Sequence, residues 1–514
     1  MTLSRTALLA AATCTFACLA RAQAITLDET YHAGLYGWAA FGGAYETTAA
    51  TGEVVFQANG VANANLDFFF EDSSGPVFVP GQTFGANYHI DGSGLMALDF
   101  GGGPTDVWNL WVPPDTNVLH YARTQPLEEA EQFVLVRKSA GMSDADLMGN
   151  YRFVSYRIDW WGGAQRLERE VGTVVFDGSG SVAYNLTVTF VAAGLVTTSQ
   201  LSGSTSYSVA PDGRLSLGGM CTVPSATCDV GAITADGEFG FAIAGGLGND
   251  QGISMIVREN AAPDLQQLEG RYGFTTHTMV DTEAETCLGA ADVVASSATQ
   301  GTWTGAETYV RSSPSGITVI NNPQSGASSL TLANGALLNQ SAGFVDDRLW
   351  ISSNYRYVIG ESLDFENQSN NGEGIGITLC TRMAPAPQAF GVGTPGVAGT
   401  PELSTKGFAL LGSTTFGYVV CNGVPSGFAI VPVATASAPG VPALGGLIYV
   451  DPTAVGVVFL ALLDPAGCGV VSLPIPNTPA LNGLTLFSQG LALDPTTTSG
   501  FAMTAGLGVA IGSF

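Results

Sequence analysis

Val171-Gly172-Thr173-Val174-Val175-Phe176 leads through Asp177-Gly178 into the alternating run Val182-Ala183-Tyr184-Asn185-Leu186-Thr187-Val188-Thr189-Phe190. Val, Thr, Tyr and Phe favour β-strands, and alternation of apolar with polar residues gives a strand one buried face. Asp-Gly accepts the left-handed backbone that a tight hairpin demands. This stretch therefore predicts an antiparallel hairpin, and the same pattern recurs along most of the chain.

The hairpin belongs to a unit that occurs three times along the sequence. The units begin with Gly34-Leu35-Tyr36-Gly37-Trp38, Gly149-Asn150-Tyr151-Arg152-Phe153 and Gly270-Arg271-Tyr272-Gly273-Phe274. They close with similar apolar strands at 133–137, 253–258 and 375–382. The second unit divides into about eight strands, a number that can close into an up-and-down barrel. An open meander or a sandwich is the alternative for each unit.

We therefore expect an all-β protein with three tandem antiparallel β-barrel-like (lipocalin-like) repeats followed by a C-terminal β-sandwich. The repeats are placed at residues 25–138, 147–260 and 267–383. Residues 384–405 are rich in Pro, Gly, Ala and Thr, which is typical of a linker. Residues 406–514 are almost uncharged, and their short apolar strands alternate with Pro and Gly turns, the pattern of a β-sandwich.

Residues 1–22 predict a secretory signal peptide. Arg5 precedes a short apolar run that ends in an A-x-A cleavage site, with cleavage after Ala22 or Ala24. The run is shorter than the roughly 20 residues that a spanning helix needs. The later apolar run from Thr453 to Leu463 is also too short and is better read as a buried strand. The sequence thus predicts a secreted or cell-envelope protein with no transmembrane span.

Six cysteines remain after cleavage, and an even number in an exported chain suggests disulfides. Grouping them by unit gives the candidate pairs Cys221–Cys228, Cys287–Cys380 and Cys421–Cys468. A metal site is disfavoured because no C-x-x-C occurs and the four histidines, His32, His89, His120 and His277, are scattered. These histidines are read as ordinary polar-face residues.

The 514-residue chain carries a formal net charge of −26. A polyanion such as nucleic acid repels a chain of this charge, so nucleic acid is excluded as a partner. Strong acidity also favours solubility and self-repulsion.

Motifs of the common enzyme classes are missing, since the chain contains no G-x-S-x-G, H-E-x-x-H or P-loop. We therefore predict no catalytic residue, no cofactor and no resident metal, and favour a non-enzymatic protein over an enzyme. Glu168 and Glu170 share one strand face and keep a paired-carboxylate glycosidase open, although a solvated strand rim is the simpler reading. The Asp-Gly turns and Asp346-Asp347 offer oxygen ligands for loose calcium binding, as the alternative to a role in the turns themselves.

Tryptophans are the remaining candidate binding residues. Trp108 and Trp111 flank a turn, and Trp160-Trp161 occupy adjacent strand positions, so that one ring points to each face. Exposed tryptophan rings can stack on sugars or on a partner. The alternative is that these rings fill the barrels or their mouths.

The last 125 or so residues resemble a C-terminal domain common in exported proteins of planctomycetes. The resemblance lies in Ala389–Gly396, Asp464–Cys468, Leu473–Asn477 and Leu484–Gln489. Many relatives carry Cys where this chain has Thr394. The resemblance implies an accessory domain appended to diverse proteins, and it implies no activity. The upstream units resemble lipocalin-type repeats that open with a G-x-Y-x-F element.

These observations predict an exported, non-enzymatic β-repeat protein that acts in cell-surface or extracellular structure or adhesion. Its expected partners are cell-surface or extracellular components, glycans among them. One alternative is binding of small apolar ligands inside lipocalin-like barrels. A second alternative is a secreted polysaccharide-active hydrolase.

Overall fold

The computed structural model describes residues 27–512 apart from short gaps. The gaps are 42–43, 73–74, 91–93, 102–106, 123–128, 162–163, 193–194, 219–223, 225–227, 246–249, 281–282, 314–315, 342–343, 363–374, 384–387, 407–408, 410, 412, 414–415, 477 and 482. The predicted signal peptide lies outside the described residues. Two compact units result: a barrel unit within residues 28–383, and a C-terminal unit that contains 384–514.

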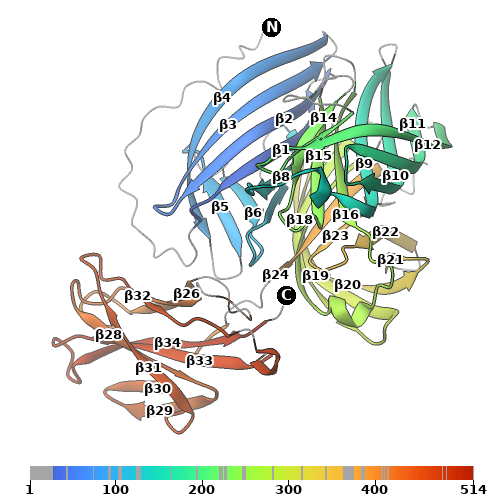
Figure 1. Cartoon of the computed structure of the whole chain (residues 1–514). Coiled ribbons are helices and arrows are strands. Elements are labelled where there is room, and N and C mark those ends of the chain that lie inside the picture. The colour runs from blue at the N-terminus through green and yellow to red at the C-terminus, as the bar shows by residue number, and fades with distance from the viewer. Residues whose placement is uncertain are drawn as a thin grey trace. The chain divides into compact units, whose positions relative to one another are not determined.

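The barrel unit contains three closed eight-stranded barrels, in which neighbours along the chain are neighbours in the sheet (Figure 1). The prediction of three antiparallel, lipocalin-like barrels is confirmed. Barrel 1 consists of β1 (Thr30–Phe41), β2 (Ala44–Gln57), β3 (Val61–Asp72), β4 (Gly75–Ile90), β5 (Leu95–Asp99), β6 (Val107–Trp111), β7 (Val118–Ala122) and β8 (Glu129–Arg137).

Barrels 2 and 3 repeat this order. Barrel 2 consists of β9 (Met148–Trp161), β10 (Ala164–Asp177), β11 (Ser181–Ala192), β12 (Leu195–Val209), β13 (Arg214–Leu217), β14 (Asp229–Ile233), β15 (Phe239–Gly245) and β16 (Asp250–Arg258). Barrel 3 consists of β17 (Gly270–Val280), β18 (Glu283–Ala295), β19 (Gln300–Ser313), β20 (Gly316–Ala333), β21 (Ala336–Ser341), β22 (Phe344–Ile351), β23 (Tyr357–Ser362) and β24 (Ile375–Met383).

The predicted alignment of the first repeat is wrong by five residues. Tyr151 pairs with Arg258 and Tyr272 pairs with Arg382, whereas the residue that pairs with Arg137 is Tyr31. Tyr31 is therefore the counterpart of the G-x-Y tyrosine, although Glu29 replaces the glycine and Ala33 the phenylalanine. Tyr36, which the letters of the motif favour, lies five residues further along the strand and so points to the opposite face of the sheet.

A shared hydrogen bond explains the repeated tyrosine. The hydroxyl of each one donates to a backbone carbonyl in the loop between the sixth and seventh strands: Tyr31 to Thr116 at 3.0 Å, Tyr151 to Gly237 at 2.8 Å and Tyr272 to Tyr355 at 3.2 Å. Each accepting residue has a positive φ, of 53°, 67° and 60° respectively. The buried tyrosine thus donates a hydrogen bond to a carbonyl oxygen that, because of the tight turn, has no partner in the sheet.

The three barrels pack on one another in a cyclic order. β1 packs against β14, β15 and β16 of barrel 2, β9 against β23 and β24 of barrel 3, and β17 against β7 and β8 of barrel 1. One hydrophobic core joins the outer faces of all three, with Tyr36, Tyr156 and Ile359 among its members. Glycine permits the closest approaches: a Cβ on Gly273 would lie 2.6 Å from the ring of Trp111.

The predicted Cys287–Cys380 disulfide is wrong, because both residues are thiols in the structure. Cys287 lies opposite Thr276 on one side of β17, and Cys380 lies opposite Phe274 on the other. Two interstrand spacings of about 4.8 Å separate them, which exceeds the roughly 7 Å over which a disulfide can form. Cys228 is disulfide-bonded, and its predicted partner Cys221 lies outside the described residues.

The C-terminal unit has a five-stranded sheet and a three-stranded sheet that share one hydrophobic core, and a two-stranded hairpin. The five-stranded sheet runs β25 (Gln388–Phe390), β34 (Phe501–Ala510), β33 (Thr485–Leu493), β28 (Phe428–Ala434) and β31 (Val455–Leu462). The three-stranded sheet runs β26 (Glu402–Lys406), β27 (Gly417–Cys421) and β32 (Gly469–Ser472), and the hairpin pairs β29 (Ser437–Ala443) with β30 (Gly446–Val450).

Two features of this unit bear on the sequence predictions. The predicted disulfide Cys421–Cys468 is confirmed, and it closes a sequence separation of 47. Strand β25 lies within the segment predicted as a linker and β26 begins in it, so the sheets begin before the expected boundary. Within the part of the chain that the structure describes, no helix is long and apolar enough to cross a membrane.

Candidate functional site

Loops from all three barrels meet at one charged group. Arg356, in the β22–β23 loop, places Nη1 3.6 Å from Asp115 and 3.7 Å from Asp236, which lie in the equivalent loops of barrels 1 and 2. Tyr357 donates to Asp115 Oδ2 at 3.2 Å. Burial raises the pKa of Asp115, and the backbone amide of Asn117 and the charge of Arg356 oppose that rise. We call Asp115, Asp236 and Arg356 the junction cluster.

A second meeting point lies at equivalent positions of the three first strands. Tyr36, Tyr156 and His277 are fully buried, with ring centroids 5.4 to 5.6 Å apart and interplanar angles of 72° to 89°. Among the described residues, no hydrogen-bond partner of ordinary geometry exists for the two tyrosine hydroxyls or the two imidazole nitrogens. Burial raises the pKa of both tyrosines and lowers that of His277 to about 3. We call these residues the axial cluster.

His120 joins barrels 1 and 3 within the same interface. Its Nδ1 lies 3.0 Å from the hydroxyl of Thr275 and its Nε2 lies 2.8 Å from that of Thr381. Burial lowers the pKa of His120 to about 3. The imidazole is therefore neutral at physiological pH and acts as a hydrogen-bonding spacer. The reading of His120 and His277 as ordinary polar-face residues is wrong, because the faces that carry them are buried between barrels.

The interior of barrel 1 is lined with aromatic rings. Phe69 faces the core between the barrels, so its neighbours Phe68 and Phe70 face the barrel interior. These two rings stack with centroids 5.6 Å apart, and both are half-buried. The predicted binding residue Trp108 stacks on Tyr121 at 5.1 Å, inside the same barrel. The arrangement offers an apolar, aromatic lining.

The interior of barrel 2 combines an apolar cluster, with Phe153 and Phe176 among its members, with charged side chains. Ser155 and Arg157 alternate with core residues of β9 and so face the barrel interior. Arg157 lies 2.9 Å from Asp229 and 3.8 Å from Glu170. Glu170 is therefore a partner in an internal ion pair, where the sequence had suggested a solvated rim. A carboxylate held by a neighbouring arginine contributes to a structural ion-pair network.

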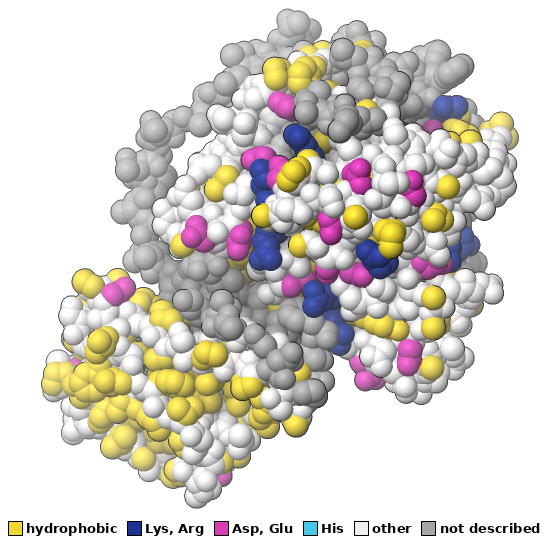
Figure 2. Space-filling model, in the orientation of Figure 1, with side chains coloured by type: hydrophobic (Ala, Val, Ile, Leu, Met, Phe, Trp, Pro, Cys, Tyr) yellow, Lys and Arg dark blue, Asp and Glu magenta, His cyan; other side chains and the backbone are white. Residues whose placement is uncertain are grey.

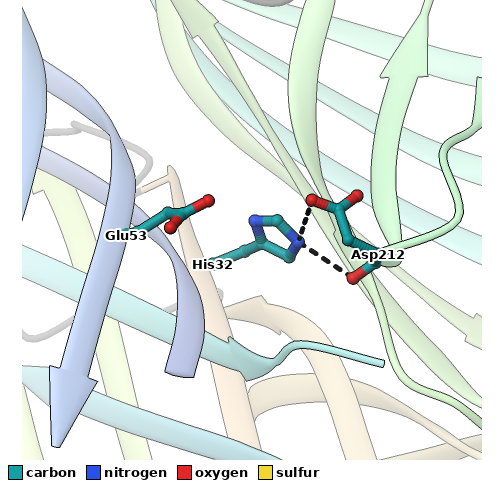
Figure 3. A group of neighbouring side chains, drawn as sticks. All are labelled: His32, Glu53 and Asp212. Carbon is teal, nitrogen blue, oxygen red and sulfur yellow. Dashed lines mark hydrogen bonds and ion pairs between the residues drawn. The ribbon is translucent and has the colours of Figure 1, made fainter. Parts of the chain in front are cut away.

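A third cluster connects barrels 1 and 2, where His32 lies between Glu53 and Asp212 (Figure 3). Their potential ligand atoms lie within 4.8 Å of one another. His32 Nε2 lies 3.0 Å from the carbonyl oxygen of Asp212, which indicates that this nitrogen carries the proton and donates. Lys138 Nζ lies 2.7 Å from Glu53 and 3.4 Å from Asp212.

The ammonium of Lys138 thus takes the position that a cation would take between the two carboxylates. Its neighbours raise the pKa of Lys138 and lower that of Asp212, although partial burial of each group acts in the opposite direction. Both groups stay charged at neutral pH. The geometry fits an ion-pair cluster that holds two barrels together better than a metal centre.

The remaining sequence candidates have mixed outcomes. Trp111 packs on Gly273 between barrels 1 and 3, and its buried Nε1 has no hydrogen-bond partner in the part of the chain that the structure describes. The side chains of Trp160 and Trp161 lie outside the described residues. The Asp177 carboxylate accepts from the backbone amides of Ser179 and Ser181, which is a structural role within its turn. Loose calcium binding at such turns stays a prediction.

Sequence reasoning missed all three inter-barrel clusters. In the sequence, Asp212 and Asp236 belong to Asp-Gly pairs and so resemble ordinary turn residues, and His32 is one of four scattered histidines. Their contacts join residues of different repeats, for which the local sequence carries no signal. An alignment of the three repeats in the correct register would have shown that Tyr36, Tyr156 and His277 occupy equivalent positions.

Comparisons with known proteins add little. No family model matches the chain, and no curated protein matches it. A protein of unknown function of the DUF3598 family from Nostoc punctiforme is 10% identical, with a TM-score of 0.16, over 46% of this chain and 95% of its own. The isotype 1 transferrin binding protein B from serogroup B Neisseria meningitidis is 9% identical, with a TM-score of 0.22, over 70% of this chain and 78% of its own. At these identities and TM-scores, neither likeness bears on what this chain does.

Proposed function

We propose that this chain is an exported, non-enzymatic β-repeat protein that acts in cell-surface or extracellular structure or adhesion. The observation that carries the proposal is the single core shared by the outer faces of three closed barrels. Closed barrels have no free sheet edges. One outer face of each barrel is buried against the other two barrels. Such a body serves as a rigid spacer or platform.

The polar contacts between barrels support the same role. The junction cluster joins all three barrels through one guanidinium, and Glu361 of barrel 3 lies 3.0 Å from Arg169 of barrel 2. Specific buried polar contacts fix one relative placement of packed elements more narrowly than apolar contacts do. The barrels are therefore expected to move as one body.

The test is localisation together with loss of function in the cells that produce the protein. We expect antibodies against the barrel unit to label intact cells, and deletion of the gene to weaken surface attachment or the extracellular layer. Label confined to the cytoplasm, or unchanged attachment and surface layer in the deletion strain, would remove the proposal.

A second candidate function, binding of a small apolar ligand, is favoured by the aromatic lining of barrel 1. Titration with fluorescent fatty-acid or retinoid probes tests it, with quenching of Trp108 as a second signal. We expect Phe68→Arg to abolish saturable binding and Val294→Arg, on an exposed face of barrel 3, to leave it unchanged. Absence of saturable binding to the unaltered protein removes this candidate.

A further inference from the structure

Strand β31 is an open edge of the five-stranded sheet in the C-terminal unit. It pairs with β28 along one side, from Phe428↔Leu462 to Ala434↔Val455. Among the described residues, no strand pairs with its other side. A strand edge presents a row of backbone N–H and C=O groups that can pair with another chain. The open side of β31 is therefore a template for one more strand.

The side chains of β31 are apolar throughout, with the sequence Val455-Gly456-Val457-Val458-Phe459-Leu460-Ala461-Leu462. The expectation of a buried strand here is wrong, because Val458, Leu460 and Leu462 share one face of the strand and are 57%, 61% and 75% exposed. We call these three residues the edge patch. A monomeric protein gains nothing from three large apolar side chains in a row on an edge strand, and such an edge invites association.

Four other edge strands in this unit are protected, in contrast to β31. β25 has only three residues and β32 only four. β29 contains Pro439 and Pro442, and β26 carries Glu402 and Lys406 at its two ends. Short length, proline and charge are the usual devices that block edge-to-edge pairing. Within β31 itself none of them is present.

Charge indicates what covers this edge. Residues 383–514 contain four acidic side chains and one basic side chain, so they contribute only −3 to the net charge of −26. Figure 2 accordingly shows the C-terminal unit as mainly apolar and uncharged, whereas acidic and basic side chains are scattered over the barrel unit. Two copies of the chain repel each other least at the C-terminal unit. The best partner for this edge is another apolar, uncharged strand, and β31 of a second copy is such a strand.

We propose that β31 pairs antiparallel with β31 of a second copy of this chain around a two-fold axis. Centred on Phe459, this pairing places Val458 of each copy opposite Leu460 of the other, so that the edge patches cover each other on one face of a continuous sheet. A two-fold interface of this kind is self-complementary and closes after two copies, which limits growth into fibres. The inference is independent of the surface function proposed above.

The test is the association state of the full chain without its predicted signal peptide. Sedimentation velocity is measured up to about 100 μM, where a micromolar Kd populates the dimer. We expect a monomer–dimer equilibrium that salt strengthens, because screening weakens the repulsion between two chains that each carry a net charge of −26. Leu460→Lys should raise the Kd at least about tenfold. Val392→Lys, at a position of similar exposure in the same unit, is the matched control and should leave the Kd unchanged.

Hydrogen exchange keeps the proposal testable if a variant misfolds. In the unaltered chain, amides of residues 455–462 should become protected as concentration rises, whereas those of β29 should not. A chain that stays monomeric, or a dimer that Leu460→Lys leaves intact, overturns the proposal. A monomer that instead binds a separate peptide of the β31 sequence also overturns it, because the occupant is then not a second copy.

Discussion

The barrel unit and the C-terminal unit differ in how they treat sheet edges and polar side chains. The barrel unit closes every sheet and buries polar groups such as His120, His277 and Glu361 where its barrels meet. The C-terminal unit carries almost no charge and leaves the apolar edge of β31 exposed. The difference indicates that the first unit makes its specific contacts between its own barrels. The second unit keeps an apolar edge available for contact with another chain.

The largest expected difference between the two units is the loss of folding stability in acid. All four histidines lie in the barrel part, and burial lowers the pKa of His120 and His277 to about 3. The unfolded chain takes up their protons below about pH 6.5 while the folded chain does not, so folding stability falls as the pH decreases from there to about 3. At pH 4 each histidine should cost about 3 kcal/mol.

The two units can be followed separately in that experiment. Every tryptophan of the chain lies before residue 351, so tryptophan fluorescence reports on the barrel part alone. Hydrogen exchange follows the C-terminal unit. A His120→Gln, His277→Phe variant should lose most of the acid sensitivity, and His89→Gln should keep it. Equal acid sensitivity in both units would contradict the comparison.

Removal of the Cys421–Cys468 disulfide should affect the C-terminal unit alone. The cross-link closes a loop of 47 residues, for which chain entropy predicts a loss of about 4 kcal/mol. The variant Cys421→Ser, Cys468→Ser is compared with the unaltered chain by hydrogen exchange and by tryptophan fluorescence in urea. A shift in the fluorescence transition would show that the units do not unfold independently.

Loss of a buried carboxylate should affect the barrel unit alone. Glu361 is 1% exposed and lies 3.0 Å from Arg169 and 2.7 Å from Arg348. Glu361→Ala leaves Arg169 without this partner between barrels 2 and 3, at a cost of about 3–5 kcal/mol. Glu361→Gln retains the shape and part of the hydrogen bonding and should cost less. Urea unfolding followed by tryptophan fluorescence measures both variants, and a negligible effect of Glu361→Ala would be inconsistent with the structure.

The smallest expected effects compare the barrels with one another. Tyr31→Phe, Tyr151→Phe and Tyr272→Phe each remove the equivalent hydrogen bond to a turn carbonyl, which should cost about 1–2 kcal/mol each. Similar losses for all three, measured by urea unfolding, would support the corrected alignment of the first repeat. A loss at Tyr36→Phe in place of Tyr31→Phe would restore the alignment that the motif letters suggested.

Much of the fold follows from local sequence, because strands and tight turns have local causes. Val182–Phe190 alternates as a strand should, and Gly178, Gly213 and Gly237 adopt the positive φ expected of their Asp-Gly turns. The register of the first repeat did not follow, because Tyr31 lacks the flanking glycine and phenylalanine of the other two repeats. The Cys287–Cys380 pairing failed for a related reason: sequence grouping cannot show that β17 runs between the two cysteines.

The clusters between barrels were beyond local reasoning for a different physical reason. Asp115, Asp236 and Arg356 come together only through the packing of three closed barrels, and nothing in the sequence around any one of them requires the others. His277 occupies the position of Tyr36 and Tyr156, so the repeat itself does not mark it as unusual. Such positions become visible only once the first strands are known to meet.

The central claim is that the three barrels form one rigid body around the meeting of β1, β9 and β17. Native-state hydrogen exchange under increasing urea tests it directly. If the claim holds, the slowest amides of these three strands exchange together, through one opening with the same free energy and the same denaturant dependence. Exchange of one first strand through a separate opening of lower free energy, while the other two stay protected, would contradict it.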